Sequence, residues 1–205
     1  MKSARKGNLY LASNVVEMLI PQRRPFLMID FVDSFSAAPR PTIEAGRHIS
    51  ANEIYFAGHF PGLHLWPGSL TIEGIGQTAA ALMTLLVMRR TAESEGRDPD
   101  APLEELRNLQ LGYQLHPGFR PANAAQFVTW LESLSPALAV GAAVDVKLHR
   151  PVFAGQRLDY RVSIATEVGE MMRFDVEASV DGTPVASGVL TGARMLRPPA
   201  VGPRA

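Results

Sequence analysis

The sequence of 205 residues contains no cysteine, no internal repeat and no excess of charge of either sign. The absence of cysteine excludes disulfides, thiol nucleophiles and thiolate metal ligands, and it fits the reducing, cytoplasmic location that we expect. Twenty basic and twenty acidic residues cancel, which argues against general binding to nucleic acid or to a membrane surface. The basic N-terminus, residues 1–6, is not followed by a long apolar stretch, so we expect no secretory signal.

One apolar run, residues 70–88, has nearly the length of a transmembrane helix. Its first half is interrupted by Glu73, Gln77 and two glycines. A helix that is apolar on all sides is equally typical of the buried centre of a globular protein. We therefore predict a central helix that begins at Gly68 or Ser69 and ends near Arg90.

The C-terminal third has the period-two alternation of half-buried strands, in residues 158–164 and again in 172–180. Asp181-Gly182 is a hairpin signal before a further strand from about 185 to 196. Sequential hairpins with one solvent-exposed face form an antiparallel sheet. With one long apolar helix, this pattern predicts an α+β fold in which the sheet wraps around the helix.

Other segments are assigned more locally. Asn14 and Glu17 have the spacing of a capping box at the start of a short helix, residues 15–20. Two strands are predicted at 26–35 and 42–50, on either side of a proline-containing turn. We treat residues 1–205 as a single domain with an insertion at about 91–138 and a flexible tail at 198–205. Two short helices are predicted within the insertion, at 103–111 and 122–134.

The candidate chemistry is concentrated around His59, which lies in a turn fixed by glycine and proline, GHFPG at 58–62. Imidazole ordinarily titrates close to neutral pH and suits a general base. Glu73 follows fourteen residues later in the apolar helix, where desolvation favours the neutral acid. Gly68, at the predicted helix start, offers a free backbone N–H to a developing oxyanion. Gln77 lies four residues after Glu73, on the same face, and is predicted to orient it.

Less specific interpretations apply to similar residues elsewhere. His48, His64, His116 and His149 lack such surroundings and are interpreted as incidental. Gly74 and Gly76, each unfavourable in a helix, are expected to allow close packing against the sheet. Four arginines, Arg23, Arg24, Arg150 and Arg157, are either solvated or form a basic rim for an acidic partner.

Three sequence blocks resemble one family. They are PQRRPFLMID at 21–30, GHFPG at 58–62 with PG at 67–68 and ExxxQ at 73–77, and RPVFAGQRL at 150–158. Their order and content are similar to the β-hydroxyacyl-acyl carrier protein dehydratases of dissociated fatty acid synthesis, which have the hot-dog fold. Gln22, the bulky segment 63–66 and the turn 154–156 depart from the family pattern. The departures leave base and acid intact but put substrate identity in doubt.

The resemblance implies dehydration of a β-hydroxyacyl thioester, with His59 as base and Glu73 as acid. It implies no cofactor and no metal, and an acyl carrier protein that presents the substrate on its phosphopantetheine arm. It also implies a homodimer, with assembly beyond the dimer left open, in which one site takes its two residues from different subunits. Fatty acid and polyketide-type synthesis are both compatible with this chemistry.

Three other functions stay open at this point. An isomerase would move the new double bond with the same two groups, and a hot-dog thioesterase would release free thiol. A non-catalytic acyl-binding subunit would have no use for a desolvated acid. The insertion is expected to cover the tunnel mouth or the dimer edge, and so to restrict which acyl groups are accepted.

Overall fold

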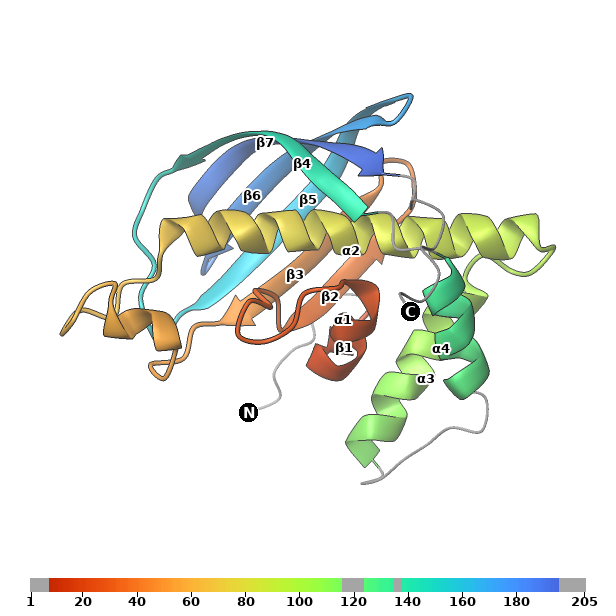
Figure 1. Cartoon of the computed structure of the whole chain (residues 1–205), viewed down its shortest axis with the longest axis horizontal. Coiled ribbons are helices and arrows are strands. Elements are labelled where there is room, and N and C mark those ends of the chain that lie inside the picture. Colours follow the sequence, from red (N-terminus) through yellow and green to blue (C-terminus); the bar gives the residue numbers. More distant parts are fainter. Residues whose placement is uncertain (1–7, 116–123, 135–137, 196–205) are drawn as a thin grey trace, which may run out of the picture.

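A curved antiparallel sheet wraps around one long helix in the computed structural model, which describes residues 8–115, 124–134 and 138–195 (Figure 1). The strands are β1 (Leu11–Ala12), β2 (Phe31–Ser36), β3 (Thr42–His48), β4 (Leu138–Leu148), β5 (Arg157–Val168), β6 (Met171–Val180) and β7 (Thr183–Met195). Their order across the sheet is β1-β2-β3-β5-β6-β7-β4. The helices are α1 (Ser13–Leu19), the short 3-10 helix η1 (Ile54–Ala57), α2 (Gly68–Ser94), α3 (Ala101–Leu115) and α4 (Ala124–Ser133). The predicted α+β hot-dog architecture is confirmed.

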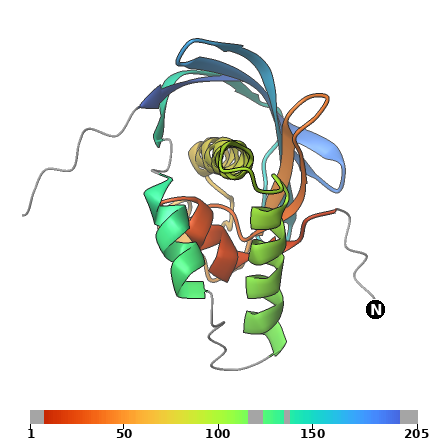
Figure 2. The same cartoon turned by 90° about the vertical axis from the view of Figure 1, so that its right-hand side faces the viewer.

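Helix α2 forms the centre of the fold, and Figure 2 looks along its axis with the sheet curving around it. By length and composition α2 could cross a membrane, and 67% of its most apolar window is buried inside the protein. This burial is that of a core helix, as predicted. The helix continues four residues beyond the predicted end at Arg90, to Ser94.

The sheet presents alternate side chains to α2. On β6, Met172, Phe174, Val176 and Ala178 are buried, and the residues between them are mainly exposed. The predicted hairpin after β6 is confirmed, because Asp181 and Gly182 have φ values of 50° and 76°, as a type I′ turn requires. Strand β4 was not predicted, and it forms one edge of the sheet.

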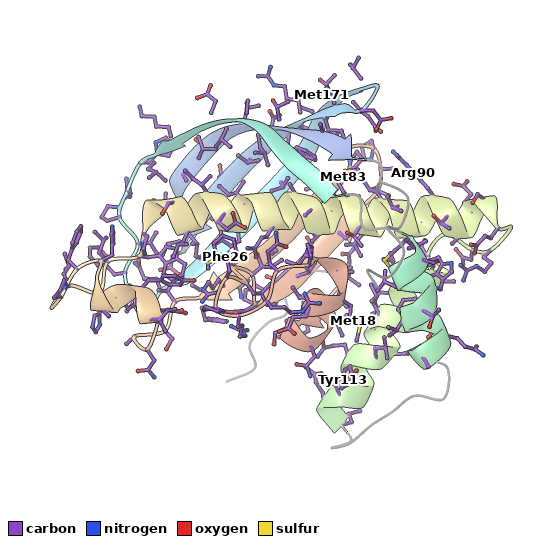
Figure 3. The ribbon with its side chains drawn as sticks, viewed as in Figure 1. Met18, Phe26, Met83, Arg90, Tyr113 and Met171 are labelled. Atoms are coloured by element: carbon purple, nitrogen blue, oxygen red, sulfur yellow. The ribbon has the colours of Figure 1, made fainter. Side chains whose placement is uncertain are left out.

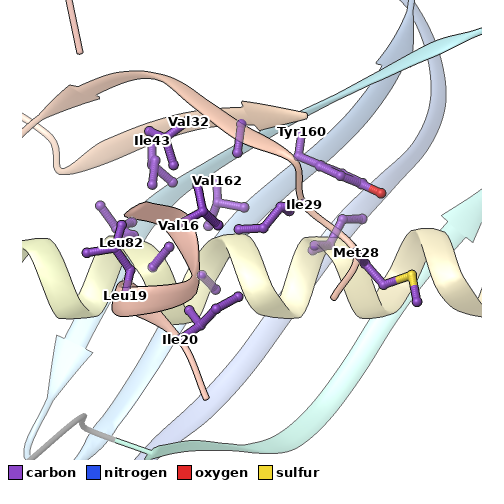
Figure 4. Close-up of a cluster of buried hydrophobic side chains, with 14 of the residues drawn as sticks. Val16, Leu19, Ile20, Met28, Ile29, Val32, Ile43, Leu82, Tyr160 and Val162 are labelled. Carbon is purple, nitrogen blue, oxygen red and sulfur yellow. The ribbon is translucent and has the colours of Figure 1, made fainter. Parts of the chain in front are cut away.

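Helix α1 closes the core on the side away from the β4 edge. Figure 4 shows Val16 and Leu19 of α1 close to Leu82 of α2 and to Ile43 of β3. The helix was predicted correctly but its cap was not. Ala12 is the N-cap residue and makes no side-chain cap hydrogen bond, so packing rather than capping holds this short helix.

The insertion packs at the C-terminal end of α2 (Figure 1). Both predicted helices are present, as α3 and α4, and Leu103, Leu106 and Leu109 join the hydrophobic cluster of α1 and α2. The Gln110 Oε1 atom accepts a hydrogen bond from the Ala12 amide at 2.8 Å, which ties α3 to β1. The indole of Trp130 donates to Glu95 at 3.3 Å, next to the end of α2. The predicted tail, 198–205, lies outside the described residues.

Candidate active site

His59 is held in a tight turn between η1 and α2. The Tyr55 carbonyl accepts hydrogen bonds from the Gly58 and His59 amides, at 3.2 and 3.0 Å. The His59–Phe60 peptide bond is cis, and Gly62 has a φ of 81°, which favours glycine. The turn predicted from glycine and proline is therefore present, with His59 half-buried within it.

The hydrogen bond of the His59 ring defines its tautomer. Nδ1 lies 3.1 Å from the Leu65 carbonyl oxygen. A carbonyl only accepts, so Nδ1 carries the proton and donates it. In the neutral ring, Nε2 then has a free lone pair, as a general base needs.

A cavity of about 320 Å³ lies beside this ring. It is lined by His59, Leu65, Trp66, Gly68, Thr71, Leu148, His149, Arg150, Pro151, Val152 and Val185. The first turn of α2 faces it, and the Gly68 amide has no intrahelical acceptor at this position. A Cβ atom on Gly68 would lie 2.4 Å from Leu148 Cδ1, so glycine lets the Leu148 side chain pack directly against the start of α2. The cavity therefore combines an imidazole ring with a helix N-terminus.

Glu73 belongs to a separate network of hydrogen bonds. Gln77 donates to the Glu73 carboxylate at 2.8 Å, as predicted from their spacing. The same amide group donates to the Phe26 carbonyl and accepts from the Met28 amide, both at 2.7 Å. Figure 3 shows Phe26 on the side of α2 away from β4 and β7. Gln77 is buried and fully bonded, so it fixes the Glu73 carboxylate to the 26–28 segment.

This network explains one wrong prediction. Residues 26–30 were predicted to begin a strand, but β2 starts only at Phe31. The backbone polar groups of Phe26 and Met28 bond to Gln77 rather than to a neighbouring strand. The Gln77 side chain thus provides the hydrogen bonds that a neighbouring strand would otherwise give to residues 26–28.

Within one chain, Glu73 does not line the cavity that contains His59. Thr71 does line it, and two residues along a helix correspond to a rotation of about 200°. Glu73 therefore points away from the cavity, along a face with Ile72, Gly76 and Ala80. These four residues are only partly buried, and a Cβ atom on Gly76 would meet nothing within 4 Å.

Two glycines of α2 and one histidine beside the cavity bear on the predictions from sequence. A Cβ atom on Gly74 would lie 2.3 Å from the Tyr160 hydroxyl, so close packing against the sheet is confirmed there. The same prediction is wrong for Gly76, which faces open space. His149 was interpreted as incidental, yet it lines the cavity and its Nε2 lies 2.7 Å from Ser187 Oγ. Its position directly before the RPV block was the available signal.

The four candidate rim arginines differ. Arg157 pairs with Asp33 and Asp159 and lies over the Phe31 ring. Its charge is therefore neutralised within the chain. Arg24 pairs with Asp30, and Arg23 donates to backbone carbonyls. Arg150 is exposed and lines the His59 cavity.

Among the residues that the structure describes, no cluster of His, Asp and Glu is suited to a metal ion. None of the described insertion residues lines this cavity, and the position of the insertion over the tunnel mouth or the dimer edge stays a prediction.

Comparison with known proteins covers the part of the chain that contains these residues. A FabA-like domain model matches residues 20–106, which include His59, Gly68, Glu73 and Gln77. A 3-hydroxyacyl-[acyl-carrier-protein] dehydratase FabZ from Anaeromyxobacter sp. strain Fw109-5 is 27% identical over 91% of each chain. Residues 20–106 thus resemble a FabA-like domain, and nearly the whole chain is similar to a FabZ dehydratase.

Further relatives extend over the same length. The FabZ dehydratase of Rhizobium leguminosarum bv. trifolii strain WSM2304 is 26% identical over 91% of each chain. Among solved structures, a chain of the dehydratase heterocomplex ApeI:P from Xenorhabdus doucetiae superposes with a TM-score of 0.52 at 14% identity. It covers 89% of this chain and 91% of that one, and it supports the fold. The similarity to FabZ dehydratases thus extends over nearly the whole chain.

Proposed function

We propose that the protein removes water from a β-hydroxyacyl thioester carried on an acyl carrier protein and gives the 2-enoyl thioester. The observation that carries the proposal is His59, with a free Nε2 lone pair, beside the N-terminus of α2 in one cavity. A base and a donor of this kind are what enolate-forming chemistry needs. FabZ relatives that extend over 91% of the chain support the same reaction class.

In the reaction, His59 Nε2 takes the proton from the carbon next to the thioester carbonyl. The Gly68 amide at the start of α2 donates to the carbonyl oxygen as negative charge develops there. The electron pair of the broken C–H bond forms the C=C bond, and the C–O bond of the hydroxyl group breaks. Glu73 gives a proton to the departing oxygen, which leaves as water. Proton transfer from the His59 imidazolium to the Glu73 carboxylate restores both groups.

We infer a homodimer, since one chain directs base and acid to different sides of α2. Strand β4 ends the sheet and carries the exposed apolar side chains Val144 and Leu148. A long unpaired edge with apolar side chains favours pairing with another strand. In a two-fold dimer each chain would supply the acid that the partner's cavity lacks. Open space beside Gly76 leaves room for an acyl chain next to Glu73.

The carrier protein is the proposed partner. The phosphopantetheine arm carries one phosphate, and Arg150 is an exposed guanidinium at the rim of the cavity that contains His59. Arginine is well suited to phosphate recognition. A cytoplasmic role in fatty acid or polyketide-type synthesis follows from this substrate class.

The test is product analysis with 3-hydroxyacyl thioesters of pantetheine and of carrier protein. We expect a product that has lost one water, with the double bond conjugated to the carbonyl and with no free thiol. Carrier-bound substrate should react with a lower KM than the pantetheine thioester. A shifted double bond would indicate an isomerase, and free thiol would indicate a thioesterase. Absence of any turnover across a panel of chain lengths would contradict the proposal.

A further inference from the structure

Arg47 is a buried cation on strand β3, opposite Leu158 of β5, with a relative exposure of 3%. Its Nη1 donates to the Leu27 carbonyl oxygen, and its Nη2 donates to Glu53 Oε1 at 2.7 Å. The guanidinium also lies over the Trp66 ring, 5.1 Å from its centroid. One side chain therefore contacts three separate segments of the chain, at Leu27, Glu53 and Trp66.

The first segment holds the acid. Leu27 lies between the Phe26 carbonyl and the Met28 amide, which are the two backbone groups that bond to Gln77. Gln77 in turn donates to Glu73. A shift of the Leu27 peptide would move the two backbone groups that fix the Gln77 amide. Arg47 is thus connected to Glu73 through the Leu27 carbonyl and the side-chain amide of Gln77.

The other two segments hold the base. Glu53 directly precedes η1, whose Tyr55 carbonyl accepts the amides of Gly58 and His59. Trp66 follows Leu65, whose carbonyl accepts the proton of His59 Nδ1. The Trp66 amide also donates to the Val152 carbonyl at 2.8 Å, one residue before Pro67 and the start of α2. Both ends of the turn that carries His59 are therefore in contact with the same guanidinium.

Stability alone does not account for this arrangement. A buried ion pair loses about as much free energy through desolvation as it gains through attraction, and is often neutral against an apolar replacement. Here the cost is increased, because Arg47 Nε is buried without a hydrogen-bond partner among the described residues. The planar guanidinium of arginine, with its several N–H donors in fixed directions, is instead suited to holding several partners in fixed positions.

We infer that Arg47 is a positioning residue. It fixes the positions of the His59 turn and of the Glu73–Gln77 network in each chain. The expected effect on kcat rests on the proposed function. The expected effect on the structure of the two segments rests on the contacts of Arg47 alone. A displacement of about 1 Å at a reacting group can cost on the order of 10² in rate. Loss of Arg47 should accordingly lower kcat while leaving KM nearly unchanged, since substrate contacts stay in place.

The first readout is kinetic, with a pantetheine thioester so that carrier docking plays no part. Arg47→Met should lower kcat per folded protein by about 10-fold to 100-fold, with KM within about threefold of the parent's. Arg47→Lys keeps the charge but lacks the fork, and should recover part of the loss. The matched control is Arg157→Met, since Arg157 also pairs with a carboxylate and lies 4.5 Å from an aromatic centroid, that of Phe31. It touches none of the three segments, and its kcat should stay within about twofold of the parent's.

The second readout, amide hydrogen exchange, needs no activity. Arg47→Met should lose protection in peptides covering 23–30 and 53–68 together, whereas Arg157→Met should lose it in neither. If Arg47→Met folds poorly, Arg47→Met combined with Glu53→Gln removes the stranded carboxylate and serves in its place. Parent-like exchange in either segment would overturn the inference, as would a parent-like kcat in an active enzyme. A parent protein without dehydratase activity would contradict the proposed function, and the exchange result would still decide the role of Arg47.

Discussion

Replacing His59 by alanine should reduce kcat for dehydration by about 10² to 10⁴, the range expected on loss of a general base. The ring is half-buried, stacks on Phe60 and leaves no buried charge behind when removed. The free energy of unfolding should therefore change by less than about 1 kcal/mol. Steady-state kinetics with thermal unfolding of the same samples measures both quantities.

The matched control for His59 lies five residues further along the same turn. His64 is exposed and stacks on Phe56 at a centroid distance of 5.1 Å, without lining the cavity. His64→Ala should keep kcat within about twofold of the parent's. Turnover of His59→Ala at the level of this control would show that His59 is not the base.

Glu73→Gln should be almost as damaging, since an amide cannot give up a proton to the departing hydroxyl group. A loss of about 10² to 10⁴ in kcat is again expected. The change is nearly isosteric and keeps an acceptor for the Gln77 amide, which now lies 2.8 Å from the carboxylate. Melting temperature and oligomeric state should therefore match those of the parent.

Glu93→Gln is the matched control for this variant, because Glu93 lies on the same helix and is exposed at its far end. It should leave kcat and KM unchanged within about twofold. Residual dehydration by Glu73→Gln at the parent rate would remove Glu73 from the mechanism. The acid would then have to be sought elsewhere around the cavity.

The parts of this fold that depend on local pattern were predictable. The start of α2 at Gly68, the hairpin at Asp181-Gly182 and the Glu73–Gln77 hydrogen bond each follow from spacing or from backbone preference within a few residues. Period-two alternation likewise predicted β6, where every second side chain is buried.

Features that depend on distant partners were not predictable. Strand β4 contains Gly141, Ala142 and Ala143, which have weak strand preference, and its pairing with β7 determines its structure. Arg47 reads as an ordinary charged residue in a strand, and only the folded chain brings Leu27, Glu53 and Trp66 around it. The difference between Gly74 and Gly76 likewise depends on where Tyr160 lies.

In the proposed mechanism one active site takes His59 from one chain and Glu73 from another. The most direct measurement is activity after co-refolding His59→Ala with Glu73→Gln, each nearly inactive alone. Statistical mixing makes about half of the dimers mixed, and each mixed dimer has one complete site of two. Activity should therefore return to about one quarter of the parent's, and to about one half in mixed dimers purified through two different tags. Mixed dimers that form but stay as inactive as the single variants would place both residues of a site in one chain and contradict the account.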